Sequence, residues 1–201
     1  MNNGKFFQFA IPVLIAFASM VSLQQASAQA TYSANGAVHT TIMGTSNIHD
    51  WELISSKGNA AMMLQMDVSG NITGIGNVYY DIQVNTLKSK HGSQMDNNAY
   101  KAIDAATYPT IKFIGGAGAI KSSGSGKYSI TAPGKLTISS VTKDVTLTAT
   151  AKVNTDKSVT IEGSYKITTT DYNVKAISIM LGAIKTSPNV TINYSMTVKP
   201  Q

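Results

Sequence analysis

The sequence contains no cysteine and no arginine, and it has one tryptophan among 201 residues. Without cysteine the chain has neither a disulfide framework nor a thiol on which a bacterial lipoprotein anchor could be built. Without arginine it lacks the usual bidentate reader of guanine. It also lacks a Gly-x-Ser-x-Gly motif, a phosphate loop and paired glutamates, so no common catalytic pattern is present. We therefore expect no enzyme, no metal and no cofactor.

The positive charge comes entirely from lysine, and it is dispersed. Sixteen lysines stand against ten acidic residues, and removal of Lys5 with the N-terminal segment leaves fifteen. Lys112, Lys127, Lys135 and Lys152 are spread one or two per segment, whereas a phosphate-tracking groove would need a patch. We expect no nucleic-acid partner.

The N-terminal segment has the order of a secretory signal. Lys5 precedes an apolar run over residues 6–21, and Ala26-Ser27-Ala28 and Ala28-Gln29-Ala30 provide small-residue cleavage sites. The run contains Gln8 and Pro12 and is shorter than the ~20 apolar residues of a spanning helix. We predict a signal peptide at residues 1–28, with cleavage after Ala28 or Ala30, and a mature domain at residues 29–201. The mature protein is expected in the periplasm or secreted, without stable membrane insertion.

Hydrophobic residues in the mature chain recur with the period of two that is typical of β-strands. Apolar positions alternate with polar ones in six segments, which gives each strand one dry face. These faces are Ala60, Met62, Leu64, Met66 and Val68; Val78, Tyr80, Ile82 and Val84; Leu136 and Ile138; Val145, Leu147, Ala149, Ala151 and Val153; Val159, Ile161, Gly163, Tyr165 and Ile167; and Val190, Ile192, Tyr194, Met196 and Val198.

Turn signals separate these strands, for example Ser69-Gly70-Asn71 and residues 154–157. Short connections make neighbouring strands antiparallel, and closure into a barrel removes exposed sheet edges. We predict an all-β fold: a single elongated antiparallel β-barrel of about eight strands.

Two segments break this period. Residues 95–105 have helical spacing and precede Tyr108-Pro109, which predicts one short helix on a connecting loop. Residues 176–184 are mostly apolar without clean alternation. Exposing them together would create a large apolar patch, so we expect them to close the barrel mouth or to be covered by a lipid or a partner subunit. A plain buried strand is the alternative.

Three motifs resemble the YceI-like family: residues 44–51 (GTSNIHDW), residues 109–113 (PTIKF) after a tyrosine, and residues 134–147 (GKLTISSVTKDVTL). The resemblance spans the mature chain in order. It implies a lipocalin-like barrel that binds a polyisoprenoid or another long-chain amphiphile in its bore. Where many members have Arg-Asp, this chain has Met95-Asp96, and where they have Arg-Asp-Phe-Gly it has residues 170–173 (TDYN).

The dry faces supply the candidate ligand-binding residues. Methionine suits an irregular ligand because its thioether side chain is flexible, although ordinary core filling is the better explanation for any single methionine. Met95 and Tyr100 on the predicted helix and three residues of the apolar segment complete the set. The expected ligand contacts are Met62, Leu64, Met66, Val78, Tyr80, Ile82, Met95, Tyr100, Leu136, Ile138, Leu147, Tyr165, Ile167, Ile179, Met180, Leu181, Ile192 and Tyr194.

The three histidines do not have the spacing of a metal site. His49 and Asp50 are adjacent and point to opposite faces of a strand, while His39 could approach His49 only with a suitable register. Three hypotheses remain open: a carrier of a long apolar lipid such as a polyisoprenoid, quinone or fatty acid; a packed barrel acting as an interaction or stress-response protein; and an enzyme acting on an amphiphile. A homodimer is compatible with each.

Overall fold

The structure is a computed structural model that describes Met1 and residues 28–201. The predicted signal peptide therefore lies almost entirely outside the described residues. Within the described part of the chain, no helix is long and apolar enough to cross a membrane.

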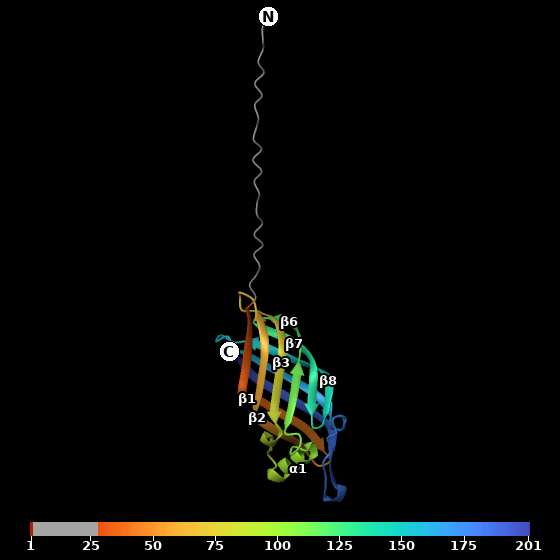
Figure 1. Cartoon of the computed structure of the whole chain (residues 1–201). Coiled ribbons are helices and arrows are strands. Elements are labelled where there is room, and N and C mark those ends of the chain that lie inside the picture. Colours follow the sequence, from red (N-terminus) through yellow and green to blue (C-terminus); the bar gives the residue numbers. More distant parts are fainter. Residues whose placement is uncertain (2–27) are drawn as a thin grey trace.

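Eight long strands make up the wall, and shorter elements connect them (Figure 1). The wall strands are β1 (Ala28–Ser46), β2 (Asp50–Met66), β3 (Ile72–Gln83), β5 (Thr110–Gly115), β7 (Lys127–Ile138), β8 (Val141–Val153), β9 (Val159–Thr168) and β11 (Ile184–Pro200). The shorter elements are β4 (Lys88–Ser89), β6 (Ala119–Gly124), β10 (Ser178–Ile179), helix α1 (Ser93–Ile103), and the 3₁₀ helices η1 (Val84–Thr86), η2 (Thr169–Tyr172) and η3 (Met180–Gly182).

The sheet closes on itself because β1 pairs with β11 on one side and with β2 on the other. Between them the order runs β11, β9, β8, β7, β5, β3, β2, with every pair antiparallel. This is an up-and-down barrel, in which each wall strand lies beside the next one along the chain. Closure gives every wall strand a partner on both sides, although β8 and β9 are paired over only part of their length. The predicted fold class is confirmed.

The alternation in β2 matches the predicted dry face as far as the strand extends. Ala60, Met62 and Leu64 are buried, while Gln65 is exposed. Val68 was expected on the same face, and this expectation is wrong, because β2 ends at Met66 and Val68 is 78% exposed in the turn that follows. Asp67 forms that turn by accepting the backbone N–H groups of Ser69 and Asn71.

Strand β3 begins six residues before the predicted alternation. The sequence pattern hides this first part because a bulge reverses which residues, odd or even, face inward. Asn77 has a φ of 48°, and the pairing with β2 shifts between Ala61 and Met63. Ile75 before the bulge and Val78 after it therefore both face inward, although they are three residues apart. A β-bulge inserts one residue into one strand and so reverses which parity is buried.

Side chains fill the end of the barrel where β1 begins. Three side chains there have no exposed surface: Leu64, Val159 and Val198. The Tyr128 hydroxyl accepts a hydrogen bond from the Ile72 N–H at 3.2 Å and joins the start of β7 to the start of β3. We call this the packed end, and it leaves the interior space in the middle and at the opposite end.

Helix α1 lies across the opposite end, which we call the helix end (Figure 1). The helix was expected over residues 95–105 and stopped by Pro109, but it stops earlier. Asp104 adopts a left-handed conformation (φ 58°) directly after Ile103, and the Ala105 N–H donates to the Tyr100 carbonyl oxygen. A left-handed residue after the last turn is an ordinary helix C-terminus.

The apolar segment 176–184 forms a hairpin at the helix end. Ser178 pairs with Lys185 and Ile179 with Ile184, while Leu181 sits at the turn with φ 56°. Leu181 is fully exposed, at 110%. The chain itself therefore does not cover Leu181, and cover of this tip by a lipid or a partner subunit stays a prediction. The side chains of Ile179 and Met180 lie outside what the structure describes.

Candidate functional site

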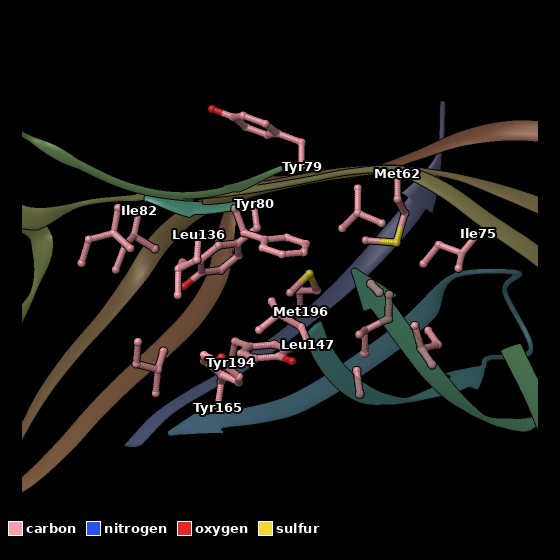
Figure 2. A pocket seen from close by; sticks show the side chains of 18 of the residues that line it. Met62, Ile75, Tyr79, Tyr80, Ile82, Leu136, Leu147, Tyr165, Tyr194 and Met196 are labelled. Carbon is pink, nitrogen blue, oxygen red and sulfur yellow. The ribbon is translucent and has the colours of Figure 1, made fainter. Parts of the chain in front are cut away.

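An apolar cavity occupies the middle of the barrel, and we call it the central cavity (Figure 2). Nineteen residues from the wall strands line it, and the free space among them is about 70 Å³. On this measure one water needs roughly 10–15 Å³ and two to four polar partners. The cavity is therefore narrow, and its wall offers water few partners. An apolar chain fits such a space better than a broad rigid ligand.

Half of the predicted contact residues line the central cavity. They come from β2, β3, β7, β8, β9 and β11, and Figure 2 labels seven of them together with Tyr79, which points away from the cavity. The predicted residues that line it are Met62, Val78, Tyr80, Ile82, Leu136, Leu147, Tyr165, Ile192 and Tyr194.

Two tyrosine hydroxyls in this cavity have polar partners from the wall. The Tyr80 hydroxyl lies 2.6 Å from the hydroxyl of Thr40, which is fully buried. The Tyr194 hydroxyl donates to the Thr148 carbonyl oxygen at 2.9 Å. Burial raises the pKa of Tyr80, and it raises the pKa of Tyr194 to about 12. Both rings therefore present their neutral forms to the cavity at physiological pH.

A second cavity lies between the barrel interior and the elements at the helix end, and we call it the helix-end cavity. It shares Ile42, Ile111 and Ile192 with the central cavity, so the two spaces are adjacent along the bore. Three further predicted contact residues line it: Met95, Ile138 and Ile167. Ala176 and Ile177 also line it, so the first part of the apolar segment does cover the bore.

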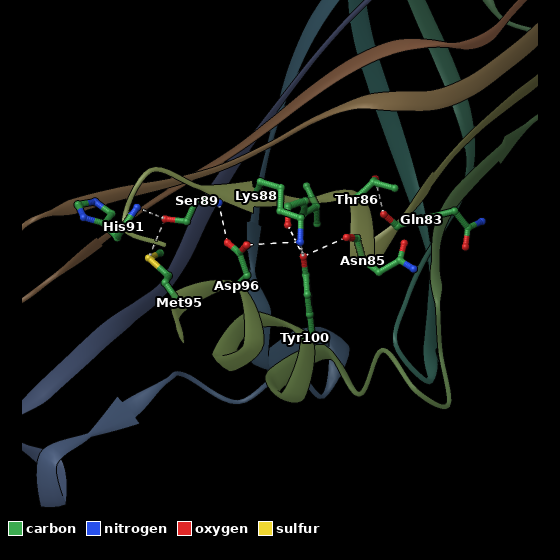
Figure 3. Close-up of polar contacts among 10 residues, drawn as sticks. Gln83, Asn85, Thr86, Lys88, Ser89, His91, Met95, Asp96 and Tyr100 are labelled. Atoms are coloured by element: carbon green, nitrogen blue, oxygen red, sulfur yellow. Dashed lines mark hydrogen bonds and ion pairs between the residues drawn. The ribbon is translucent and has the colours of Figure 1, made fainter. Parts of the chain in front are cut away.

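Polar contacts hold α1 against the wall beside this cavity (Figure 3). Asp96 is 5% exposed and accepts the Ser89 N–H at 2.7 Å, while the Lys88 ammonium lies 3.5 Å away. Lys88 also donates to the Tyr100 hydroxyl at 2.8 Å, and that hydroxyl donates to the Leu87 carbonyl oxygen. The hydrogen bond to Tyr100 is the main cause that raises the pKa of Lys88, and Asp96 adds to it more weakly.

Four predicted contact residues lie elsewhere. Leu64 is buried at the packed end and Met66 lies half-buried beside it. Tyr100 uses its hydroxyl to hold α1, as described above. Leu181 is exposed at the hairpin tip. Alternation identified the inward face of a strand correctly for Leu64, but it carries no information on the depth of a residue along the barrel axis.

Other cavity residues were missed by sequence reasoning. Ile111 and Phe113 of β5 both line the central cavity, but Ile114 is apolar and 51% exposed on the outer face, which obscures the alternation. Ile75 was hidden by the bulge at Asn77. Residues before Leu136 in β7, namely Ile130 and Ala132, continue the same period and could have been found by extending it.

The histidines do not come together as a strand pair. His39 Nδ1 lies 2.9 Å from the Ser56 hydroxyl, whereas His49 stacks on His91 with ring centroids 4.5 Å apart. Among the described residues no group of three or more His, Cys, Asp or Glu side chains is arranged to hold a metal ion.

The barrel and its two apolar cavities can be set beside known proteins. Residues 23–198 match the YceI-like domain. The chain belongs to the YceI-like family. The fold also resembles Burkholderia cenocepacia BcnA, with 22% identity, a TM-score of 0.59, and coverage of 81% of this chain and 96% of that one.

A second solved structure is a polyisoprenoid binding domain from Saccharophagus degradans implicated in plant cell wall breakdown. Its identity to this YceI-like chain is 10% and the TM-score is 0.63, over 87% of this chain and 100% of that one. At these identities the likeness concerns the fold. A comparison with curated protein sequences finds no match.

Proposed function

We propose that this YceI-like protein carries a long-chain apolar lipid, such as a polyisoprenoid, a quinone or a fatty-acid-like chain, inside its barrel. The observation that carries the proposal is the pair of adjoining apolar cavities along the bore. The name of the Saccharophagus degradans domain, which binds polyisoprenoids, supports the same ligand class.

The energetics of such a ligand are favourable without any charge. Burial of a methylene contributes ~0.8 kcal/mol, so a chain of about a dozen buried carbons could supply most of a micromolar affinity. The polar end would then set the orientation of the ligand. Residues 1–28 fit a signal peptide, so the carrier is proposed to act in the periplasm or as a secreted protein.

Native mass spectrometry of protein purified from its own cells tests the proposal. The expected result is a mass shift from a co-purifying lipid, released in organic solvent. Ala132→Phe would fill the central cavity, because Ala132 is 5% exposed and lines it. It should lose the lipid, while Ala37→Phe on the exposed outer face should keep it. A wild-type protein that is empty and binds no added prenol or quinone contradicts the proposal.

A further inference from the structure

Strands β8 and β9 are paired over only part of their length. Their pairing runs from Val153 and Val159 to Ala149 and Gly163. Beyond that point β8 continues along β7 to Val141, and β9 continues along β11 to Thr168. The two strands therefore diverge toward the helix end, and residues 141–148 face residues 164–168 without a shared ladder. We call this gap the β8–β9 seam.

Inward-facing side chains lose their cover along the seam. Within the shared ladder Ala151, Val159 and Ile161 are at most 4% exposed, while Ala149, Gly163 and Val153 at its ends are half-buried. Along the seam the inward positions Val145, Leu147, Tyr165 and Ile167 are all half-buried instead. The inner face of these two strands is thus less tightly covered along the seam than in the middle of the shared ladder.

A hollow on the outside of the barrel meets both cavities at this seam. The outer hollow has a volume of about 580 Å³ and is lined by residues of β8, β9, η2 and β11. It shares Tyr165 with the central cavity, and it shares Ile167, Tyr172 and Val190 with the helix-end cavity. One layer of side chains therefore separates the outer hollow from the bore.

The two ends of the barrel differ. The packed end offers no route, whereas a hollow of about 410 Å³ at the helix end shares Trp51, Met95, Ile177 and Thr186 with the helix-end cavity but no residue with the central cavity. At the packed end Leu64, Val159 and Val198 are fully buried. At the helix end α1 is fastened to β4 through the buried Asp96. Entry at the packed end would require core side chains to move. The hollow at the helix end adjoins one cavity, whereas the outer hollow at the seam adjoins both.

The contacts that bridge the seam, within the described residues, are made by side chains. Tyr194 reaches the Thr148 carbonyl oxygen, and Lys143 lies 3.8 Å from Asp171 in a pair that is largely exposed. The Asn173 amide donates to the Ser140 hydroxyl at 3.3 Å. Exposed ion pairs contribute about 0–1 kcal/mol. The seam can therefore widen while both flanking ladders, β7–β8 and β9–β11, stay intact.

We infer that the β8–β9 seam is the entrance through which the lipid chain reaches the bore, and that the polar end of the lipid stays in the outer hollow. This inference rests on the proposed function. The outer hollow is lined by Lys143 and Lys166 but also by Asp144 and Asp171, so its formal charges balance. Such a hollow suits a hydroxyl or carbonyl head group rather than a multiply charged anion.

Cross-linking the seam tests this inference. Because the sequence contains no cysteine, the linker can react only with the two introduced thiols. Continuing the register of Ala149 and Gly163 places Thr146 opposite Lys166, both on the outer face. The double variant Thr146→Cys/Lys166→Cys is joined by a short bismaleimide that contains a reducible disulfide. The control is Ser129→Cys/Thr150→Cys, which joins two exposed partners across the paired β7–β8 ladder. Loading of parinaryl alcohol is followed by stopped-flow fluorescence.

The cross-linked seam should load the probe at least tenfold more slowly than the control, and reduction of the linker should restore the rate. Linking after loading should slow release by a similar factor. Loading within twofold of the control would overturn the inference while leaving lipid binding standing. A wild-type protein without saturable fluorescence would instead overturn the proposed function.

A second variant covers the case in which the linker disturbs folding, as judged by circular dichroism. Lys166→Cys carrying a bulky fluorescein maleimide should load several-fold more slowly than Ser129→Cys with the same adduct. Equal rates for these two single adducts would also overturn the inference.

Discussion

Tyr194 connects the central cavity with the seam, and Gly163 makes its position possible. A Cβ added at Gly163 would lie 2.4 Å from the Tyr194 ring, so the ring could stay in place only above a glycine. We expect Gly163→Ala to displace the ring, break its bond to Thr148 and lower the free energy of unfolding by ~1–3 kcal/mol. Urea denaturation measures this change. Gly76→Ala is the matched control, because nothing lies within 4 Å of its added Cβ; equal losses would contradict the argument.

The same tyrosine predicts a pH dependence of stability. Burial raises the pKa of Tyr194 to about 12, against an ordinary value of 10.0 in the unfolded chain. Its contribution is therefore complete below pH 10 and is lost as the pH rises from 10 to 12, because only the unfolded chain releases the proton in that window. We expect the urea midpoint of Tyr194→Phe to fall less steeply there than that of the wild type. If the urea midpoints of the two proteins fall in parallel from pH 8 to 12, the raised pKa does not belong to Tyr194.

At the scale of elements, α1 depends on one buried carboxylate. Removing the Asp96 side chain would leave the Ser89 N–H without its acceptor and Lys88 without its carboxylate partner. We expect Asp96→Ala to cost ~1–3 kcal/mol of stability and to speed lipid release from the helix-end cavity. Asp144→Ala is the control, since Asp144 is 84% exposed and pairs with an exposed lysine. Similar melting temperatures for both variants would show that α1 is held by other contacts.

The apolar segment divides into a covered part and an exposed part. Ile177 lines the helix-end cavity, and the Ile177 N–H donates to the Thr186 hydroxyl at 2.9 Å, while Leu181 is fully exposed. We expect Ile177→Ser to weaken lipid retention roughly tenfold through lost apolar burial. Leu181→Ser should change stability by less than about 0.5 kcal/mol and leave retention unchanged. Dissociation rates and denaturation curves measure both. If Leu181→Ser instead lost more lipid than Ile177→Ser, the hairpin tip would belong to the part that closes the barrel.

Sequence periodicity predicted element type and inward face well, but it could not predict where strands part or pair. The dry faces of β8 and β9 were read correctly, yet nothing in Val145 or Tyr165 reveals that the ladder ends at Ala149. Beyond that point β8 stays paired with β7 and β9 with β11, and the residue pattern of neither strand encodes this choice of partner. The helix was predicted from its spacing, whereas its end depended on the left-handed conformation of Asp104, which residue pattern does not require.

At the scale of the whole molecule, the alternating faces and short turns were enough to predict a closed barrel, because closure is the general way to remove sheet edges. The division of the interior could not be predicted. Whether side chains fill the interior depends on their position along the barrel axis. Leu64 therefore packs at one end, while Met62, two residues earlier on the same face, lines the central cavity. The bore is thus closed at the packed end and bounded by α1 at the helix end.

The distribution of charge over the whole molecule predicts the class of head group. The lysines beside α1 already have partners, since Lys88 is paired with Asp96 and Lys90 with Glu52. Lys175 at the helix-end cavity is a single cation, and the outer hollow is charge-balanced. A pyrophosphate would therefore lose its hydration without gaining a cluster of cations.

We expect a quinone to bind at least as tightly as a prenyl pyrophosphate of equal chain length. Competition of the two ligands for the wild-type protein measures the ratio, at ionic strengths from ~0.05 to ~0.5 M, where the Debye length falls from over 10 Å to under 5 Å. The quinone affinity should stay constant over this range, because burial of its chain is the main source of affinity. Lys143→Ala is a useful variant, since it removes one cation of the outer hollow and should leave quinone binding unchanged. A strong preference for the pyrophosphate that weakens with salt would show that lysines at one of the openings act together as an anion site.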